Sequence, residues 1–113
     1  MALDLSTIRQ QLADELTAAG IRTVVDPRSI LAPCALVELP SSISLHQLSG
    51  DSAECVMVVT LIAPANDPGW LERNVVAAMV AIGATEARTA IYPMGEDSSL
   101  PAYNLQINLT VKE

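Results

Sequence analysis

Aromatic side chains are scarce in this chain of 113 residues. Phenylalanine is absent, and only one tryptophan and two tyrosines occur, although half of the residues are apolar. A buried core must therefore be built from Val, Ile, Leu, Ala and Met. This length suffices for one domain and is too short for two, so residues 1–113 are expected to form a single domain.

The sequence also lacks a long apolar run. No stretch approaches the roughly 20 apolar residues that a membrane-spanning helix needs. The first residues, Met1-Ala2-Leu3-Asp4, lack the basic head and the apolar stretch of a secretory signal. No membrane association is therefore expected, and the chain is expected in the cytosol.

Basic side chains are few. Six Lys and Arg residues stand against thirteen Asp and Glu residues, which gives a formal net charge of -7. This balance opposes the phosphate-neutralising contacts that supply most of the affinity for nucleic acids, so sequence-specific DNA binding is not expected. An acidic surface would suit a wall past which DNA slides without sticking, and an ordinary solubility charge explains the same balance.

Residues that carry catalysis or bind metals are sparse. His46 is the single histidine, and Cys34 and Cys55 have neither CxxC spacing nor neighbouring histidines. No zinc site is therefore expected, and both cysteines are interpreted as small buried hydrophobic residues. The glycines are scattered singly, so no phosphate-binding loop is expected. The sequence predicts no cofactor and no enzyme activity, and the pair of His46 and Cys55 is the one nucleophile–base combination left to test.

Two segments have the apolar spacing of helices. The first runs from Asp4 to Ala19 before Gly20, with apolar residues three or four positions apart at Leu5, Ile8, Leu12 and Leu16. Gly20 can take the left-handed conformation that ends such a helix.

The second helix is expected to begin at Asp67, whose side chain can cap it, with Pro68 in the first helical position. Its apolar face is formed by Leu71, Val75, Met79 and Ile82. Val76 and Val80 widen this face, so the second helix is expected to be the more deeply buried one and to pack against a sheet.

Five segments have the composition or alternation of strands: Ile21–Val25, Cys34–Leu39, Cys55–Ile62, Ala87–Tyr92 and Tyr103–Lys112. The first fits either a short edge strand or an extended linker, and the Ser-rich residues 41–52 are expected to form a long loop. This order predicts an α+β fold with an antiparallel or mixed sheet of four to five strands and two helices packed on one face.

Apolar residues occupy both alternating sets of Cys55–Ile62, which predicts that both faces of this strand are covered. A helix can cover one face, and the other needs a second element or a neighbouring subunit. The last strand has one apolar face and one uncharged amide and hydroxyl face, which would be poorly protected at a sheet edge.

Two features leave a choice between packing and binding. Trp70, at the start of the second helix, is the kind of residue that anchors interfaces, and its alternative role is to pack over the end of the sheet. The 41–52 loop contains Ile43, Leu45 and Leu48, which fits a docking loop as well as a packed connector.

The order of these segments resembles the small tail terminator, or tail-completion, proteins of long-tailed siphophages. The resemblance covers nearly the whole chain and includes the strand Pro-Cys-Ala-Leu-Val-Glu-Leu-Pro at Pro33–Pro40. It also includes the apolar strand Val56–Ile62 before the helix at Asp67, and the polar loop Gly95–Ser99 before Pro101-Ala102-Tyr103. None of these motifs is a catalytic fingerprint.

The resemblance implies a structural virion protein that forms a ring, usually of six subunits, at the end of the tail tube. Such a ring stops tube polymerisation and joins the tail to the head. The implied partners are further copies of the chain, the major tail tube protein and a head-completion or connector protein, with DNA only passing through the lumen. The implied location is the head-proximal end of the tail in the virion, and the host cytoplasm during assembly.

A ring uses two different surfaces of each subunit, which predicts apolar and acidic contact residues in the strands and loops. The residues expected to make ring, tube or lumen contacts are Ile43, Leu45, His46, Leu48, Asp51, Val56, Val58, Trp70, Met94, Glu96 and Asp97. Two alternatives remain at this level. One is another neck or tail protein, such as a tube subunit or a head-tail connector. The other is a small ferredoxin-like regulatory domain, which would need a pocket with convergent polar groups.

Overall fold

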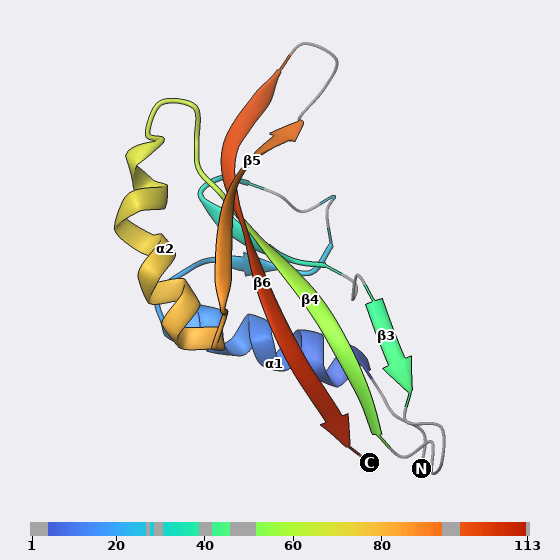
Figure 1. The fold of residues 1–113 in the computed structure, drawn as a ribbon. Coiled ribbons are helices and arrows are strands. Elements are labelled where there is room, and N and C mark those ends of the chain that lie inside the picture. The colour runs from blue at the N-terminus through green and yellow to red at the C-terminus, as the bar shows by residue number, and fades with distance from the viewer. Residues whose placement is uncertain are drawn as a thin grey trace.

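The computed structural model describes residues 5–26, 28, 31–38, 42–45, 52–93 and 98–112. Within these ranges, two helices pack on one face of a mixed β-sheet (Figure 1). The α+β class expected from the sequence is confirmed. The elements along the chain are α1 (Leu5–Ala18), β1 (Thr23–Val24), β2 (Cys34–Val37), β3 (Ser42–Leu45), β4 (Ser52–Ile62), α2 (Gly69–Ile82), β5 (Glu86–Pro93) and β6 (Ser99–Lys112).

The continuous part of the sheet has the strand order β1-β2-β4-β6-β5. β1 and β2 are parallel, and the other pairs are antiparallel. β4 and β6 pair along their full common length, from Ser52 with Lys112 to Ile62 with Ala102. β6 therefore lies inside the sheet, so its amide-bearing side chains project from a sheet face and not from an unpaired edge.

Strand β3 was not expected from the sequence, because it lies within the residues predicted to form a loop. Its backbone pairs with β4 from Ser42 opposite Val56 to Leu45 opposite Ala53. β2 pairs with the other half of the same β4 edge, so β2 and β3 lie one after the other along β4. The Ser-Ile-Ser-Leu alternation is the period of a strand, and the surrounding serines concealed it.

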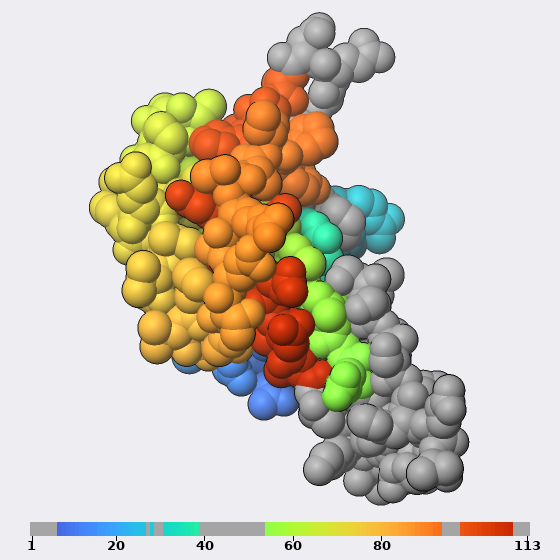
Figure 2. Space-filling view, viewed as in Figure 1, coloured from blue at the N-terminus to red at the C-terminus, as the bar shows by residue number. Residues whose placement is uncertain are grey.

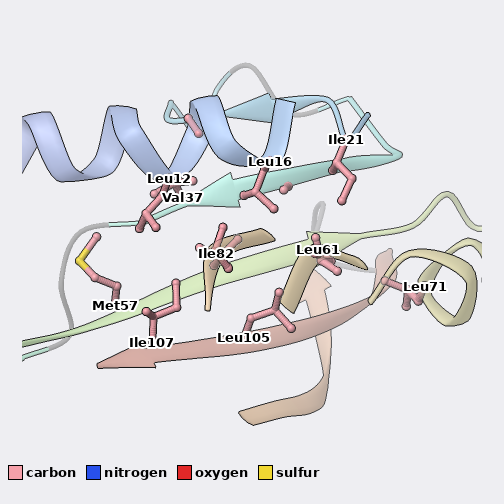
Figure 3. Packing of buried hydrophobic residues seen from close by; sticks show 14 of the residues in the cluster. Leu12, Leu16, Ile21, Val37, Met57, Leu61, Leu71, Ile82, Leu105 and Ile107 are labelled. Atoms are coloured by element: carbon pink, nitrogen blue, oxygen red, sulfur yellow. The ribbon is translucent and has the colours of Figure 1, made fainter. Parts of the chain in front are cut away.

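The main core lies between the helices and the sheet (Figure 3). Residues from both helices and from β2, β4 and β6 meet there in one buried apolar cluster, as the predicted spacing required. Its large members include Leu12, Leu16, Ile21, Val37, Met57, Leu61, Leu71, Ile82, Leu105 and Ile107. All of them are aliphatic or Met, which follows from the absence of Phe.

The ends of both helices are fixed by local backbone geometry. Gly20 and Gly83 have φ values of 87° and 71°, the left-handed conformation that turns the chain out of a helix at low cost. Arg9 of α1 also donates from Nη2 to the carbonyl oxygen of Val25 at 3.0 Å. This bond ties the helix to the segment that follows β1.

The predicted side-chain cap of the second helix by Asp67 is wrong. Pro68 occupies the N-cap position in a helical conformation, and no side chain caps the helix there. The Asp67 carboxylate instead accepts a 2.6 Å hydrogen bond from Nη2 of Arg73 in the next turn of α2. The Asp67 side chain therefore pairs with Arg73 and does not accept a hydrogen bond from a backbone amide at the start of the helix.

Candidate functional site

The sheet face opposite the helices, here called the open face, carries no helix of the described residues. Side chains alternate along β6, so Leu105 and Ile107 point into the core while Asn104, Gln106 and Asn108 project from the open face. Figure 2 shows side chains of β4, β5 and β6 on the side toward the viewer, with α2 beside them. In Figure 1 α1 passes behind these strands.

Polar side chains form a band across the middle of the open face. The Thr60 hydroxyl donates to Oδ1 of Asn104 at 3.0 Å and lies 3.4 Å from Oε1 of Glu38. In the next strand, Nε of Arg88 donates to Oε1 of Glu86 at 2.7 Å. The band therefore runs from Glu38, just after β2, across β4 and β6 to β5, and it contains two separate sets of hydrogen bonds.

A hollow lies on the open face where β4, β5 and β6 adjoin. Its volume is about 260 Å³, and it is lined by Val58, Glu86, Arg88, Asn104, Leu105 and Gln106. Pockets for small ligands usually enclose about 300–1,000 Å³. The hollow is smaller than that, and its lining combines one ion pair, two amide side chains and the apolar side chain of Val58.

One end of the open face is apolar and closed. A second buried cluster there contains Cys34, Leu36, Ile62 and Ala102, with Tyr92 and Leu100 packed against it. Further along β4, Val56 and Val58 are only half-buried. Within the described residues, the prediction that both faces of β4 are covered is therefore confirmed for the end of the strand at Ile62. It is not confirmed at Val58, which is partly exposed beside the hollow.

The outer face of α2 corrects the sequence analysis. Val76 and Val80 were expected to be buried, but their side chains are 66% and 77% exposed. The helix turns its Leu71, Ala78 and Ile82 side toward the core, and Val76 and Val80 fall on the opposite side at helical spacing. The helix therefore has a second apolar stripe that the described part of the chain leaves exposed.

The two valines have charged neighbours on the same outer face. Glu72 lies one turn before Val76, and Arg73 lies beside Glu72. Both are exposed, and Arg73 is paired with Asp67. The outer face of α2 is defined here by Glu72, Arg73, Val76 and Val80. It is charged near the beginning of the helix and apolar in the following turns.

Of the contact residues expected from the sequence, the structure describes the side chains of three. Val56 and Val58 lie on the open face, while Trp70 is half-buried and packs against the main core. Trp70 thus has the packing role, and a further interface role stays a prediction. The backbones of Ile43 and Leu45 pair with Cys55 and Ala53. The remaining predicted positions lie outside the described residues: His46, Leu48, Asp51, Met94, Glu96 and Asp97.

The interpretation of the two cysteines as buried hydrophobic residues is confirmed. Cys34 and Cys55 are free thiols with 0% and 2% of their surface exposed. Burial raises the pKa of both thiols above the ordinary value of 9.0, and for Cys34 a backbone hydrogen bond with Leu31 and the charge of Arg22 offset part of this effect. A neutral, buried thiol is a poor nucleophile.

These thiols predict a loss of stability at alkaline pH. Unfolded thiols ionise near their ordinary pKa of 9.0, whereas the folded thiols ionise only at higher pH. The stability from the neutral thiols is therefore complete below pH 9.0 and is lost as the pH rises through the folded-state pKa, by about 1.4 kcal/mol per pKa unit of difference. Urea unfolding on both sides of that pH measures this effect, with the Cys34→Ala/Cys55→Ala double variant as control. An identical pH dependence in the two proteins would contradict it.

Other features bear on the class of protein. Among the described residues, no group of three or more His, Cys, Asp or Glu side chains could hold a metal ion. No helix in the described part of the chain is long and apolar enough to cross a membrane. Comparisons with protein-family models and with curated proteins find no match for the chain.

Sequence reasoning missed the residues that now define the candidate surfaces. Val76 and Val80 did give a signal, because the apolar face of the second helix was wider than a single contact with a sheet requires. That width was interpreted as deeper burial, but the two valines are exposed. Glu86, Arg88 and Gln106 gave no signal, because only the pairing of β5 with β6 places them around Val58.

Proposed function

We propose that this protein is a structural virion protein of the tail terminator type. In this proposal, copies of the chain form a closed ring, with six subunits as the expected number, at the head-proximal end of a phage tail tube. The ring stops addition of tube protein and provides the surface to which a head-completion or connector protein binds. The resemblance of Pro33–Pro40 and of the following segments to that family supports this assignment.

The observation that carries the proposal is the presence of two dissimilar exposed surfaces on one chain. A ring with rotational symmetry uses two different patches of each subunit, whereas a twofold dimer uses the same patch twice. The outer face of α2 is convex and partly apolar, and the open face has a hollow with a polar band. A subunit with such a pair of faces can bind one neighbour with each of them.

The charge of the chain is compatible with a ring around DNA. A net charge of -7 repels the phosphate backbone, so DNA would pass through the lumen without being held. The proposal therefore includes DNA as a passenger and not as a bound partner.

Growth of tail tubes in the presence of the purified protein tests the proposal. Tube protein that polymerises alone should give long tubes, and addition of this protein should shorten them in proportion to the number of capped ends. Tubes of unchanged length would contradict a terminator. Open-ended tubes made by this chain alone would instead identify a tube subunit, because head-to-tail contacts that do not close produce filaments.

A further inference from the structure

We propose that the outer face of α2 of one copy docks on the open face of the next copy, with Val76 and Val80 over the hollow beside Val58. This inference rests on the self-association that the proposed function requires, and it names the two surfaces that make the contact. The occupant of the open face is thus a second copy of this chain.

The spacing of apolar groups on the two surfaces matches. Val76 and Val80 are four residues apart on α2, which corresponds to about 6 Å along a helix. Val58 and Val56 are two residues apart on β4, which corresponds to about 6.6 Å along a strand. A helix that lies along β4 can therefore place its two exposed valines over the two half-buried valines of the strand.

Glu72, near the start of α2, also has a candidate partner of opposite charge on the open face, Arg88. Glu72 lies one turn before Val76 on α2. Arg88 lies on β5, in the same row across the sheet as Asn104 of β6 and Thr60 of β4, and Thr60 is two residues after Val58. Docking in this direction points the Glu72 carboxylate toward the β5 side of the open face, where the Arg88 guanidinium lies. The existing Arg88–Glu86 pair is exposed, so its rearrangement costs little, and attraction between Glu72 and Arg88 fixes the orientation of the helix.

The position of the two surfaces within one subunit determines what the contact builds. The inner side of α2 covers the core face of the sheet, so its outer face points away from the sheet that it covers. One copy therefore cannot use its own α2 to cover its own open face. Each docked copy leaves its own α2 available for the next neighbour, so the contact repeats head to tail. Pairing of α2 with α2 would leave the hollow uncovered and would end at a dimer.

Two variants that each lose one surface test this arrangement. Val76→Asp/Val80→Asp removes the apolar part of the helix face, and Val58→Asp puts a charge into the hollow. Each variant alone is expected to associate more than about 30-fold more weakly than the wild type and to sediment as a monomer of 11.9 kDa. Circular dichroism and thermal unfolding establish that each variant is folded.

Mixing the two variants gives the decisive result. The Val58→Asp variant keeps an intact outer face of α2, and the Val76→Asp/Val80→Asp variant keeps an intact open face. An equimolar mixture is therefore expected to form a 1:1 heterodimer of about 24 kDa. This heterodimer cannot add further subunits, because its two remaining surfaces are the mutated ones. No heterodimer from two folded variants would overturn the inference, as would wild-type assembly by either variant alone. If Val58→Asp does not fold, Gln106→Trp fills the same hollow from a half-buried position and replaces it in the experiment.

A matched control and the tube assay separate this inference from the proposed function. Leu31 is 68% exposed and lies outside both surfaces, so Leu31→Asp should assemble as the wild type does. Variants that lose the helix face but still form rings and stop tube growth would overturn the docking and leave the terminator proposal standing. A wild-type protein that stays monomeric at its highest soluble concentration would also overturn the docking, and tube growth in its presence would then decide the function separately.

Discussion

Val59→Asp is expected to leave the chain unfolded at neutral pH. Val59 has 0% of its surface exposed and lies in the main core, between the backbones of Val37 and Leu105 on the neighbouring strands. A carboxylate there would lose its water and find only apolar neighbours, which costs more than about 4 kcal/mol. The packing of the Val59 side chain is lost as well, and a domain with a stability near the lower end of the usual range of about 5–15 kcal/mol has no margin left. Far-UV circular dichroism and the dispersion of amide NMR signals measure the loss.

Val80→Asp is the matched control, because it makes the same chemical change at a position that is 77% exposed. At protein concentrations at which both proteins are monomeric, the free energy of unfolding of this variant should stay within about 0.5 kcal/mol of the wild-type value. A folded Val59→Asp protein would show that the helix-covered side of β4 is not the core. Unfolding of Val80→Asp would show that the outer face of α2 is buried within the subunit.

Leu105→Ala is expected to lower the free energy of unfolding by about 3 kcal/mol. Leu105 is fully buried in β6, an interior strand that pairs with both β4 and β5. Removing its side chain withdraws apolar surface from the core and leaves a cavity that the surrounding strands cannot fill without moving. The urea midpoint should fall, while the dependence of the unfolding free energy on urea concentration should stay unchanged.

Leu31→Ala provides the comparison for that experiment, since Leu31 is 68% exposed and lies outside both core clusters. Its unfolding free energy should change by less than about 0.5 kcal/mol. Equal losses in the two variants would contradict the placement of Leu105 in the main core.

The parts of the fold that the sequence predicted are those with one clear apolar face. In β6 the alternation of apolar and amide residues from Tyr103 onward assigned the core side correctly, with Leu105 and Ile107 buried. In α1 the spacing of Leu12 and Leu16 did the same. Where the apolar residues follow one period and lie on one face, the type of element and its buried side are both determined.

The predictions failed where a residue could serve two purposes. Valine is favourable in a core and in an interface between chains, so the identity of Val76 and Val80 could not distinguish the two locations. Aspartate before a proline is a good cap, yet the Asp67 side chain pairs with Arg73 instead. β3 is only 4 residues long and forms by pairing with a distant segment, so its local composition indicated a loop.

The candidate surfaces depend on long-range pairing more than on local pattern. The hollow joins Val58 of β4 with Glu86 and Arg88 of β5 and with Gln106 of β6, and these residues come together only in the folded sheet. A search for catalytic or metal-binding motifs could not find such a surface, because its members are ordinary surface residue types. Contacts between subunits are therefore the kind of function for which the sequence gives the weakest local signal.

The solution mass of the purified protein, alone and with isolated tail tubes, tests the central claim of head-to-tail assembly into a terminating ring. Light scattering should give a closed species, about 71 kDa for six copies of 11.9 kDa, and electron microscopy should show a cap on tube ends. A protein that remains at 11.9 kDa and leaves tube ends bare would contradict the account and favour a small regulatory domain.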